Sequence, residues 1–147
     1  MTGYYDRKIR RYAEDLTPVP VPDEHHEQVA FFRWLQLLAI DNPECGLAYA
    51  IPNGGKRHIG TAKKLAAEGL KPGVPDICWP VPRYPYHGLY IEMKRREGGT
   101  VSAMQKEWIY RLREQGYMVA VAEGFEAAKR VFCEYIATTR RWGKNGV

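Results

Sequence analysis

Two short stretches decide the expected fold of this chain: GVPDICWPV at residues 73–81 and LYIEMKR at residues 89–95. Both are rich in the β-branched, aromatic and apolar residues that favour strands. The stretch RYPYHG at residues 83–88 separates them and is typical of a turn. Together they predict two antiparallel strands joined as a hairpin that is centred near Tyr84.

This hairpin brings charged side chains together. With the turn centred near Tyr84, Asp76 lies opposite Glu92, and cross-strand β-carbons are about 4.5–5.5 Å apart. Glu92 and Lys94 are two residues apart on one strand, so their side chains point to the same face. Both carboxylates can then reach a single cation. In the alternative interpretation, Asp76 is a turn acid and Glu92 forms an exposed ion pair with Lys94, which contributes little energy.

Two carboxylates and a lysine suit the metal-assisted hydrolysis of a phosphodiester. Hard oxygen ligands favour Mg²⁺, for which Mn²⁺ can substitute. Such an ion lowers the pKa of a bound water and offsets charge on the phosphate. Lys94 can orient the attacking water or stabilise developing negative charge. The backbone carbonyl of Met93, between the two strand residues, is a further candidate metal ligand.

The rest of the chain predicts helices and strands around the hairpin. Hydrophobic periodicity indicates helices at 24–40, 58–68, 102–115 and 125–137, and further strands at 47–52 and 117–122. The order α-β-α-β-β-α-β-α predicts an α/β domain over residues 23–138, with one mixed sheet flanked by helices. We expect residues 1–22, which end in TPVPVP, to form an extended basic arm, and residues 139–147 to form a basic tail.

Composition narrows the class of protein. The 147 residues fit one domain, and the net charge of +5 is compatible with a polyanionic partner. No apolar run approaches the roughly 20 residues of a membrane-spanning helix, and the N-terminus does not read as a secretory signal. The three widely spaced cysteines argue against a disulfide framework or a zinc knuckle, so we expect a cytoplasmic protein without a membrane partner.

Longer runs of sequence carry a family resemblance. IPNGGKR (51–57), AAEGLKPGVPDI (66–77) and the stretch from LYIEMKR to GFEAA (89–128) closely resemble the VRR-NUC (virus-type replication-repair nuclease) domain of the PD-(D/E)xK nucleases. The resemblance covers roughly residues 24–136 and implies a restriction-endonuclease-like fold and Mg²⁺-dependent DNA hydrolysis. The chain looks like the stand-alone phage and bacterial members, which implies a homodimer that cuts four-way (Holliday) junctions in DNA repair, in a bacterial or phage-infected cell.

The resemblance also implies roles for individual residues. Asp76 and Glu92 match the metal-binding acids, Lys94 matches the catalytic lysine, and Gln105 matches a glutamine beside the active site. An acid on the first helix completes the family's site. Glu27 is preferred for that role and Glu24 stays open, because both lie on one helical face. Either acid can instead simply compensate the helix dipole.

Basic residues near the hairpin are candidates for contact with the DNA backbone. The loop Asn53-Gly54-Gly55 is followed by two cations and suits an anion, although it also reads as an ordinary surface turn. It does not match a P-loop, so we expect no nucleotide cofactor. The cations that follow this loop are Lys56 and Arg57. Three further candidates, which can equally be solvated surface charges, are Arg95, Arg96 and Lys106.

Three functions remain compatible with the sequence. The first is a structure-selective endonuclease that resolves branched DNA. The second is a flap or duplex-nicking nuclease of the same fold. The third is a DNA-binding module without catalysis, against which the complete set of acids and lysine argues, because a pure binder gains nothing from carboxylates that face phosphates.

Overall fold

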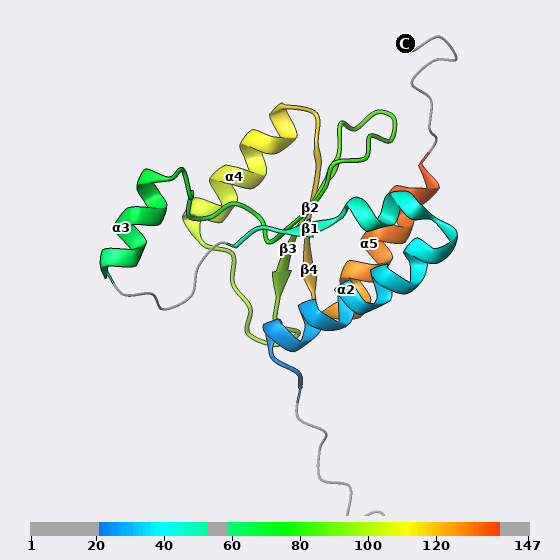
Figure 1. Ribbon diagram of the computed structural model, residues 1–147, viewed down its shortest axis with the longest axis horizontal. Helices are drawn as coiled ribbons and strands as arrows, with labels where there is room; N and C mark the ends of the chain where they lie inside the picture. The colour runs from blue at the N-terminus through cyan, green and yellow to red at the C-terminus, as the bar shows by residue number, and fades with distance from the viewer. Residues whose placement is uncertain (1–20, 53–58, 139–147) are drawn as a thin grey trace, which may run out of the picture.

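A computed structural model of the protein describes residues 21–52 and 59–138. The structure is built on one four-stranded sheet in the order β1-β2-β3-β4 (Figure 1). Its strands are β1 (Tyr49–Ala50), β2 (Ile77–Trp79), β3 (Leu89–Lys94) and β4 (Met118–Glu123). The first three strands are antiparallel neighbours, and β4 is parallel to β3. The sheet is therefore mixed, as predicted. The expected arm, loop and tail fall almost entirely outside the described residues.

The helices confirm the predicted order of elements, with one addition. They are α2 (Glu24–Asp41), the 3-10 helix η1 (Pro43–Leu47), α3 (Ile59–Ala67), α4 (Ala103–Glu114) and α5 (Phe125–Ala137). The expected strand at 47–52 was too long, because η1 includes Leu47 and only two residues form β1. Pro43 favours this short helix, since proline fits the first turn, where no N–H is needed.

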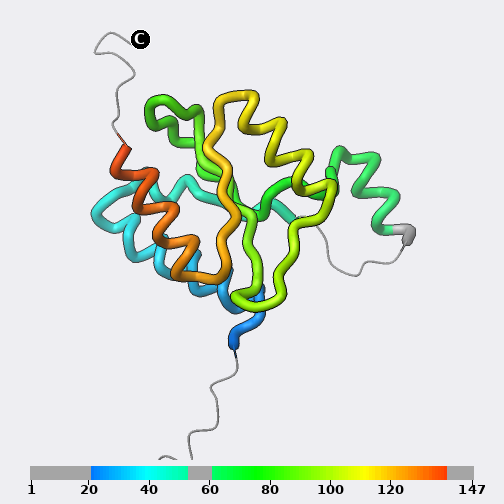
Figure 2. The backbone as a smooth tube through the Cα atoms, turned by 180° about the vertical axis from the view of Figure 1, so that it is seen from behind, coloured from blue at the N-terminus to red at the C-terminus, as the bar shows by residue number. Residues whose placement is uncertain are grey.

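The two faces of the sheet carry different layers. Helices α2 and α5 cover one face, where Phe31, Trp79 and Phe132 form the centre of the main core. Helix α4 covers part of the other face, through Ile109 and Leu112. Figure 1 shows these helices on opposite sides of the strands. In both Figure 1 and Figure 2, α3 projects away from this layered body.

The central hairpin has the predicted register. Ile77 pairs with Ile91 and Trp79 pairs with Leu89, which places Asp76 opposite Glu92. Strand β2 is shorter than the expected 73–81, because Pro75 and Pro80 flank it and neither can donate a ladder hydrogen bond. Alternation along β3 buries Ile91 against the α2–α5 layer and directs Glu92 and Lys94 to the α4 side.

Within the described residues, no helix is both long and apolar enough to cross a membrane.

Candidate active site

Asp76 is held at the point where β2 begins. Its backbone carbonyl accepts a hydrogen bond from the Ile51 N–H at 2.7 Å, which continues the pairing of β1 with β2. Its side-chain Oδ2 accepts the Met93 N–H at 2.9 Å. Asp76 and Glu92 therefore face each other as a pair that lacks ladder hydrogen bonds between their backbones, the arrangement in which side chains approach most closely.

Glu92 and Lys94 form a buried pair on β3. The Lys94 Nζ lies 2.8 Å from the Glu92 Oε1, and the two side chains are 10% and 1% exposed. This burial contradicts the alternative interpretation of an exposed ion pair. The other carboxylate oxygen of Glu92, Oε2, is buried and has no hydrogen-bond partner among the described residues. A buried carboxylate oxygen without a partner is costly, which favours a site that receives a cation.

Gln105 joins this pair from α4. Its Nε2 donates a hydrogen bond to the Glu92 Oε1, and its Oε1 accepts one from the Lys94 Nζ at 3.3 Å. The position implied for Gln105 beside the two charged residues is therefore the one observed. The amide orientation is set by these partners, because only the nitrogen can donate to a carboxylate and only the oxygen can accept from an ammonium.

The same glutamine also caps its helix, a link that the sequence analysis missed. Gln105 Oε1 accepts the Ser102 N–H at 2.8 Å, and the Gln105 N–H donates to the Ser102 Oγ at 3.2 Å. These two bonds form a capping box at the start of α4. Ser followed three residues later by Gln is the sequence signal that could have revealed it. Ser102 thus positions Gln105 for its contact with Glu92.

Gln105→Glu is expected to preserve the capping box and to damage the site. Glutamate is the other common residue at this capping position, so the helix keeps its cap. The new carboxylate loses the donor to Glu92 and adds a negative charge beside it. We expect cleavage to fall about 10- to 100-fold while the Tm in EDTA falls only slightly. A Ser102→Ala variant separates the two effects, because it weakens the cap without adding charge. A Gln105→Glu variant that cleaves at the wild-type rate would contradict this role.

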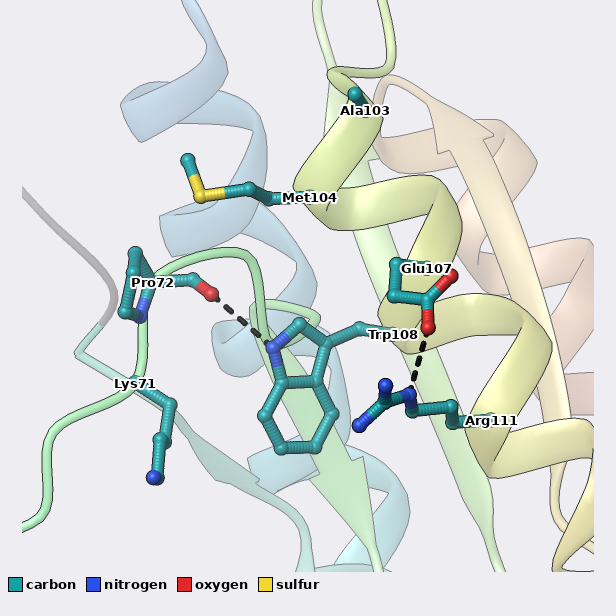
Figure 3. A pocket seen from close by; sticks show the side chains of 7 residues that line it. All are labelled: Lys71, Pro72, Ala103, Met104, Glu107, Trp108 and Arg111. Atoms are coloured by element: carbon teal, nitrogen blue, oxygen red, sulfur yellow. Dashed lines mark hydrogen bonds and ion pairs between the residues drawn. The ribbon is translucent and has the colours of Figure 1, made fainter.

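The loop that leads to Asp76 is fixed against α4 (Figure 3). Trp108 Nε1 donates a hydrogen bond to the Pro72 carbonyl at 3.1 Å. Gly73 has φ +85°, and a Cβ there would lie 2.9 Å from the Met104 backbone, so a larger residue does not fit. A cavity of about 600 Å³ lies beside Trp108, and Glu107, the one acid among the described residues that line it, is paired with Arg111. This region therefore positions Asp76 relative to Gln105.

The two candidate acids of the first helix lie in different surroundings. Glu27 is 2% exposed; Arg96 Nε lies 2.6 Å from its Oε1, and the Phe125 N–H donates to its Oε2 at 2.7 Å. It thereby joins α2 to the end of β3 and to the start of α5. Glu24 instead lines a groove together with Asp76. Burial raises the pKa of Glu24, Lys94 lowers it, and Asp76 raises it.

Comparison with known proteins identifies the family. The family model of the VRR-NUC domain matches residues 22–126. The chain belongs to the VRR-NUC family. A solved structure described as a VRR_NUC domain protein has 27% identity and a TM-score of 0.69, over 80% of this chain and 91% of that chain. No curated protein matches the sequence. Family and neighbour confirm the resemblance and the α/β fold seen in the sequence.

Membership of the VRR-NUC family makes this chain a nuclease domain of the PD-(D/E)xK type, and the family generally uses a divalent metal ion. The residues present fit such an ion. Asp76 and Glu92 are adjoining carboxylates, and Glu92 Oε2 lacks a partner among the described residues. Within those residues, however, no three His, Cys, Asp or Glu side chains are close enough together to form a ready-made metal cluster. A divalent metal ion bound at Asp76 and Glu92 would therefore need water molecules as further ligands, as Mg²⁺ usually does.

Burial disfavours the charged forms of both carboxylates at this candidate site. Burial raises the pKa of Asp76. Burial also raises the pKa of Glu92; the neighbouring Asp76 raises it further, while Lys94 lowers it. Burial alone raises the pKa of Asp76, against the opposing effects of the Met93 N–H and Lys94, whereas at Glu92 the negative charge of Asp76 adds to the effect of burial.

Asp76→Asn is expected to stabilise the metal-free protein at pH 8. The folded-state pKa of Asp76 is above its unfolded value, so its carboxyl lowers stability progressively as pH rises above about 4. Asparagine removes that cost and can still accept the Met93 N–H. We expect the Tm in EDTA to rise by about 2–4 °C, and the Tm increase caused by Mg²⁺ to be lost. An unchanged or lower Tm in EDTA would contradict this interpretation.

The basic residues expected to contact DNA are only partly placed. Arg95 and Lys106 are exposed. Arg96 forms the ion pair with Glu27 described above through its Nε, and its side chain is 46% exposed. The loop residues Asn53, Gly54, Gly55, Lys56 and Arg57 lie outside the described residues.

Proposed function

We propose that this chain is a metal-dependent, structure-selective DNA endonuclease that resolves four-way junctions as a homodimer. The observation that carries the nuclease chemistry is the contact of Asp76, Glu92, Lys94 and Gln105 on one face of the sheet. The junction and the dimer are supported by the resemblance to stand-alone family members. A twofold dimer also suits paired cuts in a symmetric junction, since each copy contributes one such set of residues.

The proposed direct metal ligands are Asp76, Glu92 and the backbone carbonyl of Met93, and Glu24 is the first-helix acid that we propose completes the site through a water ligand. Met93 directs its N–H toward Asp76. Because the N–H and C=O of a strand residue point to the same side, its carbonyl is directed there too. We favour Glu24 over Glu27 because Glu24 shares a groove with Asp76, whereas Glu27 is occupied by Arg96 and by α5. A bound Mg²⁺ or Mn²⁺ would supply Lewis-acid activation of water and offset phosphate charge.

The protein's own groups have separate tasks in this proposal. Lys94 carries the positive charge that faces the developing negative charge on the phosphate. Glu92 holds the ammonium of Lys94 at 2.8 Å, and Gln105 fixes both side chains from α4. The exposed cations Arg95 and Lys106 stand ready to contact the DNA backbone, which fixes register without reading sequence.

One cleavage experiment tests the function. The purified protein is incubated with an end-labelled four-way junction, 5′ flap, splayed arm and linear duplex, each with Mg²⁺, Mn²⁺ or EDTA, and Asp76→Ala serves as the control. We expect paired symmetric cuts in the junction only, which disappear with EDTA and in the variant. Cuts in the flap or in the duplex would instead indicate a flap or duplex-nicking nuclease. Tight binding without any cleavage would indicate a DNA-binding module. Sedimentation of the same preparation tests the dimer.

A further inference from the structure

A groove adjoins the candidate site at the free edge of the sheet. It has a volume of about 450 Å³. Glu24, His25 and Gln28 line it from the first turns of α2, Ala50, Ile51 and Pro52 line it from the end of β1 and the residues after it, and Asp76 lines it from the start of β2. The groove thus brings a carboxylate of the candidate site together with β1 and the first turns of α2.

The backbone of Ala50 faces away from the sheet at this edge. Tyr49 pairs with Cys78, Ala50 pairs with Ile77, and the Ile51 N–H donates to the Asp76 carbonyl. In an antiparallel ladder, hydrogen-bonded pairs alternate with pairs that direct their N–H and C=O outward. Since Ile51 is bonded to β2, Ala50 directs both its groups away from β2. Its N–H therefore points to the outer edge of β1, where the groove lies, and no acceptor for it is recorded among residues 21–52 and 59–138.

The lining of the groove combines two acids, Glu24 and Asp76, with His25 and with uncharged residues. Glu24 and Asp76 supply negative charge where the cation is expected. Gln28 lies one helical turn after Glu24, on the same side of α2, and adds a neutral amide to the lining. Neutral donors such as this amide and a backbone N–H can bind a phosphate without competing with a cation for the carboxylates. Both are groups that commonly contact DNA phosphates.

The distance from Asp76 to the outer edge of β1 is similar to the spacing of phosphates along one DNA strand. Neighbouring strands lie about 4.8 Å apart, so the outer edge of β1 is about one strand spacing beyond Asp76. Each DNA strand carries one phosphate per about 3.4 Å of helix axis. A phosphodiester held at Asp76 and Glu92 therefore places the next phosphate of the same strand within reach of β1.

We propose that this groove holds the nucleotide next to the cleaved bond, with the Gln28 side-chain amide and the Ala50 N–H donating hydrogen bonds to its flanking phosphate. The proposal rests on the proposed nuclease function and adds a second phosphate contact to it. Gln28 is a binding residue in this scheme and takes no part in the chemistry. The groove fixes which phosphodiester lies at the carboxylates.

A cycle between protein and substrate tests this contact. Phosphates on either side of the cut are replaced one at a time by neutral methylphosphonates, and kcat/KM is measured for the wild type and for Gln28→Ala. A hydrogen bond to a charged group predicts that each single change lowers kcat/KM about tenfold. At one flanking position, Gln28→Ala should then cause no further loss, because the contact is already gone. Gln36→Ala, an exposed glutamine on the same helix, should leave every value unchanged.

A second variant guards against a folding defect. Ala50→Pro removes the outward N–H without breaking a bond to β2, a position where edge strands tolerate proline. Its kcat/KM on unmodified DNA should also fall about tenfold. Replacing that flanking phosphate by a methylphosphonate should then cause no further fall. If both variants lose activity independently of every methylphosphonate, the groove does not hold the flanking phosphate.

A binding measurement separates this inference from the function on which it rests. The same cycle is carried out on DNA affinity with Ca²⁺ in place of Mg²⁺. If the wild type cleaves no DNA, the nuclease proposal fails, while coupling of Gln28 to one phosphate in binding still supports the groove. If the effects of Gln28→Ala and of the methylphosphonate add at every position, both in cleavage and in affinity, the nuclease proposal stands and the groove proposal is overturned.

Discussion

Glu92→Ala is expected to reduce DNA cleavage by at least about 1,000-fold. The substitution removes a buried carboxylate that faces Asp76, and it leaves Lys94 without its ion-pair partner at 2.8 Å. Loss of a single preorganised electrostatic group commonly costs about 10²- to 10³-fold, and here a proposed metal ligand and the orientation of a lysine are lost together. Single-turnover cleavage of saturating four-way junction measures the effect on the chemical step.

Binding distinguishes this loss from damage to the DNA interface. The variant should bind junction DNA as tightly as the wild type or more tightly, because a carboxylate that repels phosphate is gone. Glu134→Ala is the matched control, since it removes an exposed glutamate from α5. Wild-type cleavage by Glu92→Ala would show that the candidate site is misassigned. A parallel loss of affinity and rate would instead assign Glu92 to DNA binding.

The hairpin was predictable because its signals are local. Two prolines limit β2, a turn follows it, and alternation along β3 separates Ile91 and Met93 from Glu92 and Lys94. Register follows from the position of the turn, and one register error would move both charges into the apolar core. The pairing of Asp76 with Glu92 could therefore be predicted before any tertiary contact was known.

Other parts of the site depend on distant contacts that one sequence does not reveal. The environment of Glu27 is made by Arg96 and Phe125, which are 69 and 98 residues further along the chain. The shortness of β1 reflects η1, a local helix that begins at a proline and uses residues also compatible with a strand. Gln105 was placed by resemblance, but its double role with Ser102 requires α4 to stand directly over β3.

Glu27→Ala is expected to lower the free energy of unfolding by about 3 kcal/mol, whereas Glu24→Ala should leave it nearly unchanged. Glu27 is buried, and its loss removes a partner from Arg96 and from the first N–H of α5. Breaking a buried ion pair from one side typically costs about 3–5 kcal/mol, and the exposed part of Arg96 places this case at the lower end. At this chain length, that corresponds to a fall in Tm of about 10 °C.

Cleavage activity should rank the same two variants in the opposite order from stability. Glu24→Ala is expected to lower the cleavage rate about 100-fold at a temperature where both variants are folded, because Glu24 shares the groove with Asp76. Glu27→Ala should retain most of its activity there, since its carboxylate is already bound to Arg96. Denaturant unfolding monitored by circular dichroism and single-turnover cleavage are measured on the same preparations. A stable but inactive Glu27→Ala beside a fully active Glu24→Ala would reverse the assignment and make Glu27 the metal ligand, with its contact to Arg96 broken when the ion binds.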